Sequence, residues 1–180
     1  MEITLRQRQA ISLITAVCVA SFSSAYADME DITANAKISS PLTISSASSL
    51  EFGEVTRPNT GQCDYELGPD SELIVSGGSD CMAMSGTPFA AEFTINCAVD
   101  VLVRFELTYE NQAPDGAVFS AGENSMDIDG RGAGDVLQVT GCDSDGQTQV
   151  SAGGRLSVTP TAPDDFTGTV GTIRLEAIYD

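Results

Sequence analysis

The sequence has no histidine and no tryptophan, and only eight of its 180 residues are Lys or Arg. Without histidine, Ser-His-Asp and Cys-His nucleophile arrangements, HExxH sites and histidine-ligated metals are excluded. The lack of tryptophan removes the strongest aromatic platform for a sugar. Scarce basic residues oppose binding to nucleic acid and to anionic lipid surfaces. No glycine-rich phosphate loop stands between a strand and a helix, and no carboxylate pair is singled out. We therefore expect no enzyme.

The first 27 residues have the pattern of an export signal. Arg6 and Arg8 precede an apolar run, Ala10–Ser21, that is short for a bilayer span. Ala25-Tyr26-Ala27 has the small residues of a signal peptidase site, which places cleavage before Asp28. The alternative is a retained anchor, and no later stretch resembles a transmembrane helix. We expect an exported protein, in the periplasm, at the cell surface or outside, of a Gram-negative bacterium.

Cleavage leaves residues 28–180, and this length suits one domain with its own core. Removing Glu2, Arg6 and Arg8 leaves 25 acidic and 6 basic residues, a net charge of −19. Such a charge is typical of a protein kept soluble outside the cell. A surface that binds calcium is the alternative interpretation.

Four cysteines remain after Cys18 leaves with the signal: Cys63, Cys81, Cys97 and Cys142. An even number in an exported chain indicates disulfides, for which three pairings are possible. We prefer Cys63–Cys81, because the residues between them read as two strands joined by a Gly-Pro-Asp turn, whose ends meet as in a hairpin. Cys97–Cys142 then follows by exclusion. A zinc site is the alternative, but no CxxC spacing is present.

Apolar residues recur at every second position along most of the chain, as in half-buried strands. Expected strands are ITANAKIS with its continuation to Ile44, SLEFGEV, the two arms of the Cys63–Cys81 hairpin, FAAEFTINC, VLVRFELTY, SMDID, DVLQVT, GGRLSVT and GTIRLEAIYD. No helical stripe follows the signal. Short strands between Gly- and Asp-rich turns predict an all-β protein, an antiparallel β-sandwich that is Ig-like or pilin-like.

In ITANAKIS one face of the strand carries Ile32, Ala34, Ala36 and Ile38. A strand so near the start of the mature chain needs a sheet to join. The same parity continues to Ile44, as it would in the first strand of a self-complete sandwich. The other possibility is that the strand joins the sheet of a neighbouring copy.

A calcium site is a further hypothesis. Asp127, Asp129 and Asp135 stand in the glycine-rich stretch DIDGRGAGD, and CDSDG is a similar fragment. Closely spaced carboxylate oxygens are what calcium prefers. However, Arg131 and Gln138 occupy positions where an EF-hand places oxygen ligands. A plain acidic turn is the alternative.

Two segments carry a resemblance to a known family. PLTISSASSLEFGEV and GGRLSVTPTAPDDFTGTVGTIRLEAIYD look like the two ends of the bacterial family called domain of unknown function 4402, and Met126 fits its middle. The resemblance covers nearly all of the mature chain. That family is secreted and has no assigned activity, so the resemblance implies location and fold. The four cysteines and the acidic loops depart from its pattern.

A weaker resemblance points to archaic chaperone–usher pilins of the spore-coat-U-like branch. The final strand ending in Tyr179 and the stretch FTINCAVDVLVRFEL are similar to that group. The resemblance implies a sandwich that lacks one strand, supplied by a neighbour's N-terminal segment, and a periplasmic chaperone. In that case Ile32, Ala34, Ala36 and Ile38 would fill the neighbour's pockets.

The sequence thus favours a structural or adhesive surface protein, possibly a fimbrial subunit that self-associates by strand addition. The alternative is a monomeric extracellular module that binds glycan or calcium. An enzyme would need a pocket of clustered carboxylates, which the sequence does not indicate. No cofactor is expected apart from the calcium hypothesis.

Overall fold

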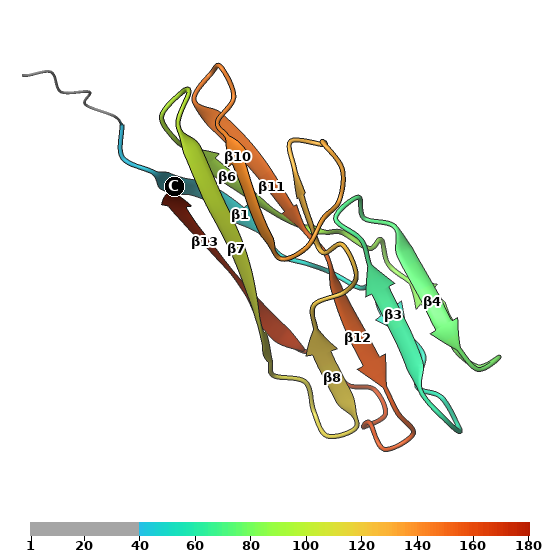
Figure 1. The fold of residues 1–180 in the computed structure, drawn as a ribbon. Helices are drawn as coiled ribbons and strands as arrows, with labels where there is room; N and C mark the ends of the chain where they lie inside the picture. Colours follow the sequence, from blue (N-terminus) through green and yellow to red (C-terminus); the bar gives the residue numbers. More distant parts are fainter. Residues whose placement is uncertain (1–39) are drawn as a thin grey trace, which may run out of the picture. The chain divides into compact units, whose positions relative to one another are not determined.

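The computed structural model describes residues 40–180, where every regular element is a β-strand (Figure 1). The signal segment, Cys18, the boundary at Asp28 and the strand candidates Ile32, Ala34, Ala36 and Ile38 lie outside these residues. The strands are β1 (Thr43–Ser48), β2 (Glu54–Val55), β3 (Cys63–Leu67), β4 (Leu73–Gly77), β5 (Ala83–Ser85), β6 (Ala91–Asn96), β7 (Leu102–Asn111), β8 (Ala117–Ser120), β9 (Met126–Ile128), β10 (Leu137–Gly141), β11 (Gln147–Ala152), β12 (Gly154–Val158) and β13 (Gly171–Tyr179). Between residues 40 and 180, none of the structure is a helix that could cross a membrane.

All strand pairs in the described part are antiparallel and form three sheets and a short ribbon. The β6 sheet has the order β1-β6-β11-β9, and the β7 sheet has the order β10-β7-β13. The β12 sheet has the order β4-β3-β12-β8, and β2 pairs with β5. β11 and β12 are separated by Gly153 alone, so one stretch of chain serves two sheets in succession. The predicted antiparallel sandwich is confirmed.

Two apolar clusters hold these sheets together. The first lies between the β6 and β7 sheets and includes Ile95, Phe105 and Val150, none of them exposed. The second lies against the β12 sheet and includes Tyr65, Leu67 and Phe119. Alternation places one face of each strand in a cluster, as β7 shows with Val103, Phe105 and Leu107 buried and intervening residues more exposed.

Most of the expected strands are present, with corrections at their ends. The first strand was expected to run without interruption to Ile44, but β1 begins only at Thr43 and residues 40–42 are outside any strand. Phe89 was expected to point inward, yet its side chain is 55% exposed, because β6 starts two residues later. Three strands were not predicted, namely β5, β8 and β11.

Both predicted disulfides are present. Cys63 is bonded to Cys81 across a Cα–Cα distance of 5.4 Å, and Cys97 to Cys142 across 6.1 Å. The predicted hairpin between the first pair is formed by β3 and β4 with a turn at Gly68–Ser71, where the Ser71 N–H donates to the Gly68 carbonyl. The second bridge joins the end of β6 to the residue after β10, and so links the β6 sheet to the β7 sheet.

Candidate functional site

A groove with a volume of about 990 Å³ opens between two segments that are far apart in sequence. One wall is Ala47–Val55, from the end of β1 to β2, and the other is Phe166–Ile173, which leads into β13. The floor is formed by Ala91, Phe93, Phe119 and Leu156. We call this feature the β1–β13 groove.

The two walls are unpaired strand edges. β1 pairs only with β6, and β13 only with β7, within the described residues. No backbone hydrogen bond joins residues 43–55 to residues 166–178 in that part of the chain. The side chains of Thr43, Ile44 and Ser45 in β1 are exposed, as are those of Ala47 and Ser48. Unpaired N–H and C=O groups beside an apolar floor are what an added strand requires.

The walls are tied together at the β1 start. The Tyr179 hydroxyl, at the end of β13, donates to the Ser40 carbonyl at 2.8 Å and accepts from the Ala98 N–H at 2.7 Å. The C-terminus accordingly lies beside the start of β1 in Figure 1. Tyr179 therefore anchors the last strand to both the chain before β1 and the end of β6.

A second tie lies beyond the other end of the walls. The guanidinium of Arg57, two residues after β2, donates to the carbonyls of Pro160 and Ala162 at 3.1 Å each. It also pairs with the Asp164 carboxylate at 2.9 Å. These residues precede Phe166 in the chain. The walls are thus held at both ends and separate between them.

Phe119 is the central side chain of the floor. Its ring centroid lies 6.2 Å from that of Phe52, in an edge-to-face arrangement, and 5.7 Å from that of Tyr109. A Cβ placed on Gly171 would lie 2.0 Å from Phe119 Cδ1, so only glycine lets β13 begin directly over this ring. The Tyr109 hydroxyl donates to the Gly153 carbonyl at 2.7 Å, and burial raises the pKa of Tyr109 to about 12.

The first wall is braced from behind. The Thr56 N–H donates to the Met82 carbonyl at 3.0 Å, and the Tyr65 hydroxyl donates to the Thr56 carbonyl at 2.6 Å. Met82 follows Cys81, which is bonded to Cys63 beside Tyr65 in β3. The disulfide therefore holds the wall at a fixed place on the β12 sheet.

The charged residues that line the groove are Glu51 and Glu54, both exposed. The Ser85 hydroxyl of β5 donates to the Glu54 carboxylate. No Lys or Arg is among the lining residues. The groove is apolar at its floor and negative at its rim.

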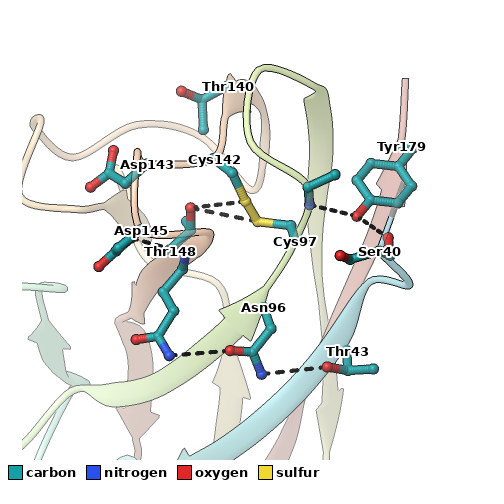
Figure 2. Close-up of a disulfide and its surroundings, with 12 residues drawn as sticks. Ser40, Thr43, Asn96, Cys97, Thr140, Cys142, Asp143, Asp145, Thr148 and Tyr179 are labelled. Atoms are coloured by element: carbon teal, nitrogen blue, oxygen red, sulfur yellow. Dashed lines mark hydrogen bonds between the residues drawn. A yellow bond between two sulfur atoms is a disulfide. The ribbon is translucent and has the colours of Figure 1, made fainter. Parts of the chain in front are cut away.

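The Cys97–Cys142 bridge lies at the end where β1 begins, as Figure 2 shows. The Thr148 hydroxyl lies 3.9 Å from Cys97 Sγ and 3.6 Å from Cys142 Sγ. Next to it, the Asn96 amide donates to Thr43 Oγ1 at 3.4 Å. This polar cluster joins the edge strand β1 to the interior of the β6 sheet.

The acidic loops are organised around Arg131. Its guanidinium pairs with Asp143 and lies 3.5 Å from Asp129 Oδ2. Asp127 accepts from the Gly132 N–H at 3.0 Å, and Asp129 Oδ1 accepts from the Gln149 N–H at 2.7 Å. These carboxylates thus serve loop backbone groups and an arginine of the same chain.

Burial raises the pKa of the Asp129 carboxyl, and the nearby carboxylate of Asp143 adds to this shift, while the Gln149 N–H and Arg131 oppose it. Asp129 Oδ2 has no hydrogen-bond partner. Among residues 40–180 no group of three or more carboxylates or cysteines is placed to hold a metal ion. The calcium hypothesis for Asp127, Asp129 and Asp135 therefore finds no support in the geometry.

The groove is the feature that the sequence did not predict. Its walls include the turn-rich stretch Phe166–Val170 and the bent stretch Ser49–Gly53, neither of which carries a clear alternating pattern. One available signal was the glycine pair Gly168 and Gly171 beside Phe166, which marks close packing at the start of the last strand. The sequence named a strand in search of a sheet, and the structure shows a sheet edge without a strand.

A family model matches residues 42–179, and its description is "Domain of unknown function (DUF4402)". No curated protein matches the chain. No solved structure matches it either.

Proposed function

This chain belongs to the DUF4402 family, whose description assigns no activity, and from that premise we propose that it is a non-enzymatic structural or adhesive protein of an exported surface assembly. In this proposal the β1–β13 groove receives a β-strand from another polypeptide. Strand addition joins subunits through backbone hydrogen bonds, with side chains buried in the groove for specificity.

The β1–β13 groove carries this proposal. An unpaired strand edge beside apolar pockets is a liability in a protein exposed to other chains, unless a partner covers it. Here two such edges face each other over aromatic side chains, and Phe166 on one wall is 45% exposed. The Tyr179 and Arg57 ties hold the walls in place without a bound strand, so the site is preformed.

Two disulfides are consistent with export, since such bridges persist in oxidising compartments. A subunit of a surface assembly must resist unfolding outside the cell, and the bridges secure one groove wall and the link between two sheets. The other candidate function is a monomeric module that binds glycan or calcium. The described tyrosines favour it little, because Tyr65 is fully buried and Tyr109 packs on Phe119.

The test is the oligomeric state of the exported protein. We would purify the mature chain from the periplasm and measure its mass by size-exclusion chromatography with light scattering. Phe166→Arg places a charge at the groove wall, and Thr169→Arg does the same at a neighbouring exposed position. Val118→Arg is the matched control, because Val118 is 54% exposed and lies outside the groove.

We expect assemblies larger than one subunit for the wild type and for Val118→Arg, and monomers for the two groove variants. Circular dichroism and unfolding curves would establish that the variants are folded. A wild type that stays monomeric at every concentration would overturn the proposal and leave the binding module. Assembly of Phe166→Arg and Thr169→Arg at the wild-type level would remove the groove from it.

A further inference from the structure

Resting on the proposed function, we infer the identity of the strand: residues Ile32–Ser39 of a second copy of this chain occupy the β1–β13 groove. Ile32, Ala34, Ala36 and Ile38 then face the floor, and the intervening polar residues face solvent. This assigns both the acceptor site and its occupant.

Charge complementarity selects this segment. The chain from Asp28 onward has a net charge of −19, so most of its segments would be repelled by the rim residues Glu51 and Glu54. Ile32–Ser39 has no acidic residue and carries Lys37, the only lysine of the sequence. Lys37 has the parity of a rim-facing residue, with a side chain long enough to approach Glu51 or Glu54.

The length of chain ahead of the sandwich also suits the inference. The first described strand begins at Thr43, so 15 residues of the expected mature chain, Asp28–Leu42, precede it. Eight extended residues span about 26 Å, comparable with the roughly 30 Å of a nine-residue strand such as β13. An eight-residue strand can therefore line the edge of β13, with Ser40–Leu42 left as a connection.

A second copy fits better than the chain's own segment. Ser40 is bonded to Tyr179 at the end of β13, whereas the groove is lined by Gly171–Ile173 at its start. The chain's own segment would have to reverse at Ser39–Pro41 and run back along β1. Two-residue hairpin turns need Gly or Asn at positive φ, and Pro41 has its φ fixed at a negative value.

The sole lysine permits a direct test. Isotopically heavy and light mature protein would be unfolded together with disulfides intact, refolded as a mixture, and treated with a carbodiimide. This reagent condenses an amine with a carboxylate into an amide, with net loss of water. We expect Lys37 coupled to Glu51 or Glu54 in peptide pairs that combine a heavy and a light chain. Glu51→Gln and Glu54→Gln together should remove the product, because the acceptor carboxylates are gone.

A parity test uses the full mature chain. Ile38→Asp buries a carboxylate in the groove and should reduce the assembled fraction by at least about tenfold, since an unpaired charge is costly to desolvate. Thr33→Asp, on the opposite face of the same segment, should assemble within about twofold of the wild type. The urea midpoint of the Ile38→Asp monomer should match that of the groove-blocked Phe166→Arg monomer.

The outcomes separate this inference from the proposed function. Coupling of Lys37 only within one isotope, with a lower urea midpoint for Ile38→Asp, would mean that the segment completes its own sandwich. Assembly that depends on Phe166 but not on Ile38, with Lys37 coupled elsewhere, would overturn the occupant and leave the groove's function standing. A wild type without assembly would overturn both.

Discussion

At the scale of single residues, close packing under β13 depends on the absence of a side chain at Gly171. A Cβ there would lie 2.0 Å from Phe119 Cδ1 and 2.6 Å from the Glu110 carbonyl oxygen. Phe119 cannot move freely, because Phe52 and Tyr109 pack on it. The floor of the groove and the start of the last strand are therefore coupled through one glycine.

We predict that Gly171→Ala lowers the free energy of unfolding by about 1–3 kcal/mol, since the added methyl group forces the ring or the strand to shift. Gly141→Ala in β10 is the matched control, because a Cβ there meets no atom within 4 Å. Urea unfolding followed by circular dichroism measures both. Equal effects of the two substitutions would contradict the packing argument.

Asp129 supplies a prediction on pH. Because burial raises its pKa in the folded protein, the folded state holds the proton to a higher pH than the unfolded state does. The slope of stability on pH is then negative between the two pKa values, so the contribution of Asp129 falls as pH rises above the model value of 3.8. Asp129→Asn, which keeps an oxygen for the Gln149 N–H, should remove this decline.

Measuring the free energy of unfolding of the wild type and of Asp129→Asn from acid to neutral pH tests this sign. The difference should grow in favour of Asp129→Asn as pH rises through that window and then level off. A wild type that gains stability relative to the variant over the same window would show that Arg131 outweighs burial at this carboxylate.

At the scale of elements, the disulfides brace different parts of the fold. Cys63–Cys81 closes 18 residues and holds the groove wall at Thr56, whereas Cys97–Cys142 closes 45 residues and links two sheets. By the loop-entropy relation, removing the first should cost about 3 kcal/mol and removing the second about 4 kcal/mol.

Paired Cys→Ala variants of each bridge, compared by urea unfolding, check this order. Removal of Cys63–Cys81 should also weaken assembly beyond its effect on stability, because the wall would no longer be held. A larger stability loss for the shorter loop would mean that native packing around Cys63, which is fully buried, outweighs the entropy of the unfolded chain.

Element prediction from sequence succeeded where the two-residue period was strong, as in β7 and β13. It failed at β11, whose buried residues are Thr148, Val150 and Ala152. A threonine, a valine and an alanine among glutamines give little hydrophobic contrast, yet β11 lies inside the β6 sheet. Thr148 is buried there because its hydroxyl faces the Cys97–Cys142 bridge, a partner that lies 51 residues away from it at Cys97.

At the scale of the whole molecule, net charge opposes the proposed assembly. Subunits of charge −19 repel one another, and only Lys37 brings a positive charge to the inferred contact. Salt shortens the range of this repulsion, from a Debye length of about 30 Å at about 0.01 M to about 3 Å at about 1 M.

We therefore predict that assembly of the mature protein becomes faster as sodium chloride rises between these two concentrations. Light scattering at a fixed protein concentration follows the rate, and sucrose of matched osmolality is the control. A rate that falls with salt would indicate that the attraction between Lys37 and the groove rim dominates over the repulsion between whole subunits.

The sequence by itself determined the all-β class, the disulfide pairs and the apolar face of the N-terminal segment, because alternation and cysteine spacing are local properties of the chain. It also indicated the family, through its two ends. Only the tertiary structure decided where a strand is missing, because the β1–β13 groove joins Ala47–Val55 to residues more than 100 positions later. No local pattern records that two edges, each adequate as a strand, are held apart by ties at Tyr179 and Arg57.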